Sequence, residues 1–362
     1  MTKRIFATTI LPEHIIAKNK LSFAACNFSS NLISGNGFDK VYSTMPVYVG
    51  GEMDADAFAD DRFELLYDSF RKRGGLFQKI AAFKEQFTLF RKIPRGASVW
   101  FYNLYVLNFL TVILLRLFKP SVQVNVIELD FTPPTKRFSL GSLYLWLLNR
   151  SNGVIKLSDS PLFTNKNSVC LPGVTPVNQE TAPSIDSPKL VFLLSGELQP
   201  NISSLPMILE AFSQVPECTL HVTGIEKYKG EVDSYNKKYP NIIFHDSMRF
   251  SDYLELLHSV TFQLSLRNPD WADNQCNFPS KIIEALLHNR GVISTITYNQ
   301  LEGINYILTE RSVEGFVSTL HKIANMSENE LMRYVNQGAK VQISFSAEVW
   351  NDYMTKIENY TL

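Results

Sequence analysis

The sequence predicts an α/β fold made of two Rossmann-like domains, each with a parallel sheet whose carboxyl ends face an interdomain cleft. The first observation is a strand–helix–strand unit between 262 and 296, and the second is a similar unit between 98 and 130. The third is a Pro- and Ser-rich stretch, 175–188, which has the composition of a linker. At 362 residues, the chain has room for two domains of ordinary size.

In the C-terminal unit, apolar and polar residues alternate over 262–266, which indicates a strand. A polar loop is expected over 267–277, and Pro279 suits the first turn of the helix that follows. The helix is expected to end at 289–291, with Gly291 as its stop and a cation in its last turn. The run 292–296 is mostly apolar, as in a strand of a parallel sheet.

Glu284 is the most informative residue of this unit, because it lies in an otherwise apolar helix and costs free energy there unless it is hydrogen-bonded. Ser280, Glu284 and His288 share one helix face, and Ser280 and Lys281 lie at the N-terminus, which favours an anion. A nucleoside diphosphate would place its phosphates at the helix start and its ribose on Glu284. In the alternative interpretation Ser280 caps the helix, Lys281 is solvated and Glu284 pairs with a nearby cation.

The N-terminal domain is expected to begin with a strand over 4–9, a helix over 21–33 and a strand over 40–49. The apolar run 99–117 has the length of a transmembrane helix, but Asn103, Asn108 and Arg116 interrupt it. We therefore predict a strand over 98–102, a helix over 105–118 and a strand over 123–130, all part of the core. Asp130 would end the last strand and face the cleft.

The second domain, 189–344, is expected to open with a strand over 189–194, followed by Gly196, whose backbone can approach a ligand closely. Arg249 follows the strand predicted over 241–244. Four further segments complete the prediction, a strand and three helices: 219–223, 251–258, 312–324 and 347–358. The last helix, within 345–362, is expected to cross back to the N-terminal domain, 1–174.

The segment 62–95 is rich in Lys, Arg and Phe, with Glu85 its only acidic residue from 71 onward. Two interpretations stay open: a helix that lies on an anionic membrane surface, or a solvated helix whose Phe side chains pack inward. Asp54 and Asp56 resemble a metal-binding carboxylate pair, but their acidic context favours a solvated helix start.

The composition excludes some classes of function. The formal net charge is zero, which gives no overall field for nucleic acid. The four cysteines have no metal-ligand spacing, so we expect reduced thiols in a cytoplasmic protein and no metal or other cofactor. The first residues lack the long apolar run of a signal peptide.

The unit 262–296 resembles the nucleotide-sugar signature of GT-B glycosyltransferases, specifically the retaining family four. The matching residues are Pro279, Ser280, Glu284 and the run Gly291-Val292-Ile293. Lys281 directly after Ser280 resembles enzymes that build bacterial surface polysaccharides. The chain departs from that family at Cys276, where many members have a second Glu, and in the loop 197–204, which lacks the usual Arg and Lys.

The resemblance implies transfer of a hexosyl unit from a UDP- or GDP-sugar to a hydroxyl of a glycan or lipid-linked glycan, at the inner face of the cytoplasmic membrane. It implies catalytic roles for Asp130, Lys281 and Glu284. The donor nucleotide would contact Gly196, Arg249, Arg267, Asn277, Ser280, Lys281 and Glu284. Asp270, Asp273, Asn274 or Asn277 would replace the missing Glu at 276. Two alternatives are a catalytically silent GT-B subunit that binds a partner, and a sugar-nucleotide epimerase.

Overall fold

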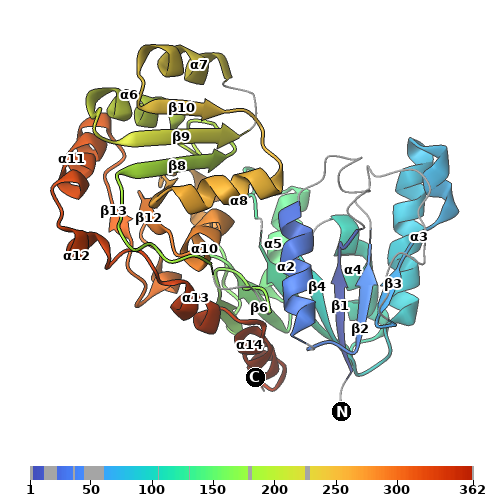
Figure 1. The fold of residues 1–362 in the computed structure, drawn as a ribbon. Helices are drawn as coiled ribbons and strands as arrows, with labels where there is room; N and C mark the ends of the chain where they lie inside the picture. Colours follow the sequence, from blue (N-terminus) through green and yellow to red (C-terminus); the bar gives the residue numbers. More distant parts are fainter. Residues whose placement is uncertain are drawn as a thin grey trace. The chain divides into compact units, whose positions relative to one another are not determined.

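The computed structural model describes residues 3–11, 23–35, 37–44, 61–104, 106–129, 131–177, 182–224 and 229–360. The chain divides into two compact units: unit 1 is 1–177 together with 345–362, and unit 2 is 178–344. Each unit has one sheet, and the strands of both sheets pair in parallel (Figure 1). The predicted α/β class with two parallel sheets is therefore confirmed.

The sheet of unit 1 has seven strands in the order β3-β2-β1-β4-β5-β6-β7. The strand order reverses beside β1, because the chain first adds β2 and β3 on one side and then β4 to β7 on the other. The strands are β1 (Arg4–Thr8), β2 (Lys40–Ser43), β3 (Phe63–Leu65), β4 (Ser98–Tyr102), β5 (Gln123–Glu128), β6 (Gly153–Lys156) and β7 (Ser168–Cys170).

Helices follow β1, β3, β4 and β5, whereas β6 and β7 pair in parallel through the stretch 157–167, which has no helix. The helices are α2 (Phe23–Ser34), the 3-10 helix η1 (Ser69–Arg73), α3 (Leu76–Lys92), α4 (Val106–Phe118) and α5 (Leu140–Asn149). The strand, helix and strand predicted over 98–130 are present as β4, α4 and β5.

Polar residues of α4 have specific partners inside unit 1. Asn108 Nδ2 donates to the carbonyl of Asn103 at 2.9 Å, and Thr111 Oγ1 donates to the carbonyl of Gln86 in α3 at 3.0 Å. Within the described part of the chain, no helix combines the length and the apolar character needed to cross a membrane.

The helix α14 (Ala347–Glu358) packs in unit 1, far in sequence from the strands that it contacts. Its last residue, Glu358, accepts hydrogen bonds from Arg4 Nε at 2.9 Å, Ser98 Oγ at 2.5 Å and Trp100 Nε1 at 2.8 Å. One carboxylate thus joins α14 to both β1 and β4, next to the point where the strand order reverses.

The sheet of unit 2 has six strands in the order β10-β9-β8-β11-β12-β13. They are β8 (Val191–Gly196), β9 (Thr219–Gly224), β10 (Ile242–His245), β11 (Phe262–Ser265), β12 (Gly291–Ser294) and β13 (Ile307–Leu308). The core between the sheet and its helices includes a stacked pair, Phe192 and Phe262, with ring centroids 5.5 Å apart.

The α-helices of unit 2 include four that the sequence did not predict, α7, α9, the short α12 and α13. The predicted polar loop 267–277 contains α9. The helices are α6 (Leu205–Gln214), α7 (Lys229–Lys238), α8 (Phe250–Ser259), α9 (Ala272–Cys276), α10 (Ser280–Leu287), the 3-10 helix η3 (Asn299–Leu301), α11 (Val313–Ala324), α12 (Glu328–Leu331) and α13 (Gly338–Ser344).

The helix α10 ends near the predicted position, but Gly291 is not the residue that ends it. Asn289, at φ 64°, provides the left-handed residue instead of Gly291, and Arg290 is buried. Gly291 instead begins β12, where a Cβ atom would lie 2.6 Å from the ring of Phe262. The glycine is therefore required by close packing against that ring.

Part of the stretch predicted as a linker, 175–188, is bound to unit 2. Ala182 and Pro183 accept hydrogen bonds through their carbonyls from Asn289 and Arg290, each at 2.8 Å. Ile185 exchanges two hydrogen bonds with the side chain of Asn336.

The basic segment 62–95 differs from its prediction at Arg71, which is fully buried and forms an ion pair with Glu85 at 2.6 Å. Arg71 therefore cannot contribute to a basic surface. The pair Asp54 and Asp56 and the residue Asp130 lie outside the described residues.

Candidate functional site

The strand order of unit 2 reverses between β8 and β11. The chain leaves β8 to form β9 and β10 on one side, and then returns through α8 to form β11 on the other. The carboxyl ends of parallel strands lie at one edge, and open α/β sheets bind ligands at the point where the order reverses. Several predicted site residues lie at this point.

Gly196 is the last residue of β8 and has φ of 106°, a conformation that side chains other than glycine rarely adopt. A Cβ atom at this position would lie 3.0 Å from Cε of Lys281. The absence of a side chain therefore lets Lys281, which comes from the first turn of α10, lie against the end of β8.

The N-terminus of α10 is open. Pro279 occupies the N-cap position, and no side chain of the described residues caps the helix. The alternative prediction that Ser280 caps α10 is wrong, since Ser280 is the first helical residue and its side chain is exposed. The first turn also has no acidic residue. Its N–H groups and the helix dipole favour an anion here.

Glu284 lies one turn into α10 with about a quarter of its side chain exposed. Its Oε2 atom accepts a hydrogen bond from the hydroxyl of Tyr253 in α8 at 2.7 Å and lies 3.5 Å from Nζ of Lys281. Both contacts involve Oε2, and within the described residues Oε1 has no hydrogen-bond donor. One carboxylate oxygen is thus held by the protein and the other is open.

Lys281 lies over the ring of Tyr253, with Nζ 4.5 Å from the ring centroid and 3.4 Å from the hydroxyl oxygen. The pKa of Tyr253 is raised well above its usual range, chiefly by burial and also by the negative charge of Glu284. The tyrosine therefore stays neutral and acts as a donor to Glu284. Glu284 pairs with a nearby cation, as the alternative interpretation expected, and that cation is Lys281. This pair does not cap the N-terminus of α10, which stays open to an anion.

Arg267, just after β11, is joined to α9 by a hydrogen bond from its Nη1 atom to Oδ1 of Asn274 at 3.0 Å. Asn274 is buried and also donates to the carbonyls of Asn201 and Asn268, at 2.9 and 2.8 Å. All its hydrogen-bonding groups are used within the protein, so Asn274 is a poor substitute for the missing Glu at 276.

Cys276 is buried in α9, and Asn277 is the partly buried residue that joins α9 to α10. Asp270 lies on the exposed loop before α9, while partial burial raises the pKa of Asp273 in α9. Asp270, Asp273 and Asn277 therefore remain the predicted substitutes for the missing Glu at 276.

Arg249 precedes α8 and is mostly exposed, with its guanidinium in an ion pair with Asp252 at 3.0 Å. Its predicted place beside a nucleobase stays a prediction, as does the role of Asp130.

Tyr253 is the site residue that the sequence analysis missed. It could have been recognised from its position in α8, where Tyr253, Leu256 and Leu257 form the buried face. A tyrosine on a buried face needs a partner for its hydroxyl.

A histidine pair lies at the far end of the same two helices. Nε2 of His258 in α8 is 2.9 Å from Nδ1 of His288, which follows α10. Burial is the main cause that lowers the pKa of both imidazoles. Together with the bond from Tyr253 to Glu284, this pair fixes α10 against α8.

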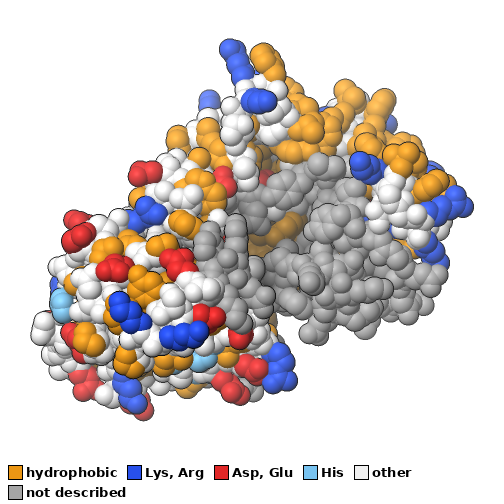
Figure 2. Space-filling view, turned by 90° about the horizontal axis from the view of Figure 1, so that it is seen from above, with side chains coloured by type: hydrophobic (Ala, Val, Ile, Leu, Met, Phe, Trp, Pro, Cys, Tyr) orange, Lys and Arg blue, Asp and Glu red, His pale blue; other side chains and the backbone are white. Residues whose placement is uncertain are grey.

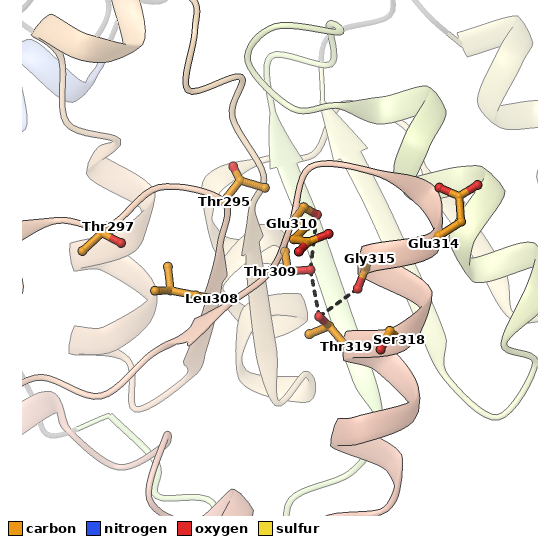
Figure 3. A pocket seen from close by; sticks show the side chains of 9 residues that line it. All are labelled: Thr295, Thr297, Leu308, Thr309, Glu310, Glu314, Gly315, Ser318 and Thr319. Atoms are coloured by element: carbon orange, nitrogen blue, oxygen red, sulfur yellow. Dashed lines mark hydrogen bonds between the residues drawn. The ribbon is translucent and has the colours of Figure 1, made fainter.

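A polar pocket of about 640 Å³ lies at the carboxyl ends of β12 and β13, against the first turns of α11 (Figure 3). Thr309 and Thr319 point toward one another in it, with their hydroxyls 2.9 Å apart. Glu310 and Glu314 are among the nine residues that line it, and none of the nine is a Lys or Arg. This charge pattern disfavours a diphosphate, so the anion site at α10 is the better candidate.

No protein-family model matches the chain, and no curated protein matches it. Solved structures match over its whole length. The N-terminal domain of a trehalose-6-phosphate phosphatase from Candida albicans is 13% identical, with a TM-score of 0.68, and the match covers 100% of this chain and 98% of that one. Alr3699/HepE from Anabaena, in complex with UDP and glucose, is 13% identical, with a TM-score of 0.65 and full coverage of both chains.

An α,α-trehalose-phosphate synthase (UDP-forming) from Burkholderia vietnamiensis is 8% identical, with a TM-score of 0.67 and 99% coverage of each chain. At these identities the likeness shows the fold alone. The two parallel α/β units are those of the GT-B fold.

Proposed function

We propose that this chain is a glycosyltransferase, which moves a hexosyl unit from a UDP- or GDP-sugar to a hydroxyl of a glycan or lipid-linked glycan acceptor. The observation that carries the proposal is the meeting of Gly196, Lys281 and Glu284 at the point where the strand order reverses, beside the open start of α10. The similar Anabaena structure, a complex with UDP and glucose, supports a nucleotide-sugar donor.

The diphosphate would lie between the end of β8 and the start of α10. The glycine lets the phosphates approach the backbone, and the helix N-terminus and Lys281 supply positive potential. Arg267 is the second candidate cation. The ribose hydroxyls would donate to Oε1 of Glu284, because Oε2 already accepts from Tyr253.

In the reaction, the bond between the anomeric carbon and the diphosphate oxygen breaks while the acceptor oxygen bonds to that carbon, and the acceptor proton passes to the departing diphosphate. The departing diphosphate gains charge as the bond breaks. Groups fixed around it before the reaction stabilise that charge without having to reorganise. We propose that Lys281, Arg267 and the α10 N-terminus do this without a metal ion, with retention of anomeric configuration.

The acceptor would bind at unit 1, with Asp130 on the acceptor side. A place in bacterial surface polysaccharide synthesis, on the cytoplasmic side of the membrane, follows from the pairing of Ser280 with Lys281 in the signature. The balanced net charge gives no reason to expect a nucleic-acid partner.

The test is calorimetric titration of UDP and GDP into the wild-type protein and the Glu284→Gln variant. Glutamine keeps the shape but removes the charge. The variant should bind the nucleotide more weakly by about 1–3 kcal/mol, the scale of a hydrogen bond to a buried charged group. Glu302→Gln, an exposed residue of the same unit, is the matched control and should bind as the wild type does.

Lys281→Ala should weaken binding of the nucleoside diphosphate more than that of the bare nucleoside, because its charge faces the phosphates. Unchanged affinity in both variants would remove the α10 site from the proposal. Nucleotide binding without any hydrolysis of nucleotide sugars would identify a silent subunit. Conversion of one nucleotide sugar into another would identify an epimerase.

A further inference from the structure

The helix α3 has apolar residues on the side that faces away from the core. Its buried residues are Ala81, Ala82, Glu85, Gln86 and Leu89. Leu76, Ile80, Phe83 and Phe87 are spaced by three or four residues, so they form a stripe on the opposite side. Phe83 is 59% exposed and Phe87 is 48% exposed. A helix whose outer side contacts only water normally has polar residues on that side.

Cations lie on both edges of this stripe. By helical spacing, Lys79 lies on one edge, and Lys84 and Arg91 lie on the other. Lys84 is 3.5 Å from Asp68, whereas the side chains of Lys79 and Arg91 form no ion pair with any described residue. The stripe is therefore apolar in its middle and positive at its margins.

The charge of the surrounding segment is strongly one-sided although the whole chain is neutral. Residues 69–150 contain thirteen Lys and Arg but only three acids, Glu85, Glu128 and Asp130. Glu85 and Glu128 are buried, and Asp130 lies outside the described residues. No described acid of this segment is thus available at the surface to neutralise its cations.

The surface continues from α3 over the ends of α4 and α5. The ring of Phe90 lies 6.0 Å from that of Phe87 and 6.3 Å from that of Phe118, which ends α4. Arg116 donates to the carbonyl of Arg150 at 3.0 Å, and the Arg150 guanidinium lies 4.6 Å from the ring centroid of Trp146 in α5. Trp146 is 49% exposed.

Figure 2 shows hydrophobic side chains in orange beside Lys and Arg in blue over the end of the molecule that holds α3 in Figure 1. Exposed aromatic rings next to unpaired cations fit the boundary between lipid headgroups and acyl chains. At this boundary the aromatic rings are removed from water, while the Lys and Arg side chains reach the lipid phosphates. Patches of this kind mark interaction surfaces.

We propose that the surface formed by α3 and the C-terminal ends of α4 and α5 binds an anionic lipid bilayer, with the stripe Leu76, Ile80, Phe83 and Phe87 inserted at the headgroup boundary. Charge complementarity selects an anionic bilayer over a neutral one, since each surface cation is attracted by anionic headgroups. The proposal does not depend on the nucleotide site, which lies in unit 2.

The experiment is co-sedimentation of the full chain with vesicles of phosphatidylcholine alone or mixed with phosphatidylglycerol. We expect binding only to the anionic vesicles, weakened by added salt. Lys79→Gln combined with Arg91→Gln should weaken binding about 25-fold, at about fivefold per charge. The control, Lys237→Gln combined with Lys238→Gln, makes the same charge change on the exposed α7 of unit 2 and should leave binding unchanged.

Phe83→Ser combined with Phe87→Ser should weaken binding by at least about tenfold. The control is Ile343→Ser, which changes a more exposed apolar residue of α13 and should have no effect. Fluorescence of Trp146 should shift to shorter wavelength when anionic vesicles are added, and a Trp146→Phe variant should lose the shift.

Three results would overturn the proposal. One is the absence of binding to anionic vesicles, and another is equal binding to both kinds of vesicle. The third is a concentration-dependent dimer that the Phe83 and Phe87 variant abolishes in the absence of lipid, since this would assign the surface to a second copy of the chain.

Discussion

The hydroxyl of Tyr253 donates to Oε2 of Glu284 across 2.7 Å, and this bond joins the middle of α8 to the middle of α10. It fixes which carboxylate oxygen is held by the protein, and therefore which oxygen faces a ligand. Glu284 alone would have several rotamers; a buried neutral donor reduces them to one.

Tyr253→Phe removes this bond and keeps the ring. We expect a loss of about 1–2 kcal/mol in the free energy of unfolding and weaker UDP binding, since Glu284 loses its orientation. Urea unfolding and calorimetry measure the two effects. Tyr235→Phe removes a similar bond at the surface, from Tyr235 to Glu210 at 3.0 Å, and should leave UDP binding unchanged. Equal UDP affinity in both variants would contradict the orienting role.

Gly196→Ala tests the close approach at the end of β8. The alanine must adopt φ of 106°, and its Cβ atom would lie 3.0 Å from Cε of Lys281. We expect a loss of stability of about 1–3 kcal/mol from backbone strain, with weaker binding of nucleoside diphosphate. Gly230→Ala in α7 meets no atom within 4 Å and should be neutral or stabilising. If the Gly196→Ala variant binds UDP as tightly as the wild type does, the glycine is needed for packing alone.

The ion pair of Arg71 and Glu85 should dominate the stability of the α3 region. Glu85 also accepts from the backbone N–H of Asp68 at 3.0 Å. Glu85→Ala removes the carboxylate that pairs with the buried Arg71 guanidinium, so we expect a loss of about 3–5 kcal/mol in the free energy of unfolding. Lys40→Ala removes an ion pair with Glu64 whose side chains are about one-third exposed, and it should cost less than about 1 kcal/mol. Similar losses for the two variants would show that the Arg71 site admits water.

The His258 and His288 pair should make unit 2 sensitive to acid. The pKa of each imidazole is lowered in the folded state, mainly by burial, and the Arg290 charge contributes. The Glu284 charge opposes the shift of His288. Below the unfolded pKa of about 6.5 the unfolded chain therefore binds more protons, so stability is present above that pH and falls as the pH is lowered through the folded values.

Urea unfolding at pH 7.5 and pH 5.5 measures this sensitivity. Replacing both histidines by Gln should reduce the difference between the two pH values. The control His321→Gln lies on the surface beside Glu217 and should keep the full difference. A double variant as acid-sensitive as the wild type would assign the effect to other groups, of which the pair His221 and His245 is the first candidate.

Strong local patterns predicted much of this fold. The bounds of α14 and β4 agree with the prediction to the residue, because the N-cap Ser346 marks the start of α14 and a short apolar run marks β4. The helix α7 was missed because its sequence, KGEVDSYNKK, is largely polar. The strands β3, β7 and β13 were missed because each has three residues or fewer, too short for an alternating pattern.

The site shows the same division. Glu284 and Lys281 could be identified because they lie four residues or fewer apart on one helix. Tyr253 could not, because its contact with Glu284 spans 31 positions and depends on how α8 crosses α10. The approach of Lys281 to Gly196 likewise exists only once the sheet has brought β8 next to β11.

The carboxylate of Glu358 is made late in synthesis, long after the groups that it binds in unit 1. Trp100 and Ser98 are made more than 250 residues before their shared acceptor, and at about 5–20 residues per second translation takes about 13–50 s to reach it. Throughout that interval the nascent sheet of unit 1 has the indole N–H of Trp100 and the guanidinium of Arg4 without their carboxylate. Unit 2, whose residues all lie between, can complete its own core first. A chain that ends before Glu358 would therefore contain all of unit 2, while its unit 1 lacks the carboxylate shared by Arg4, Ser98 and Trp100.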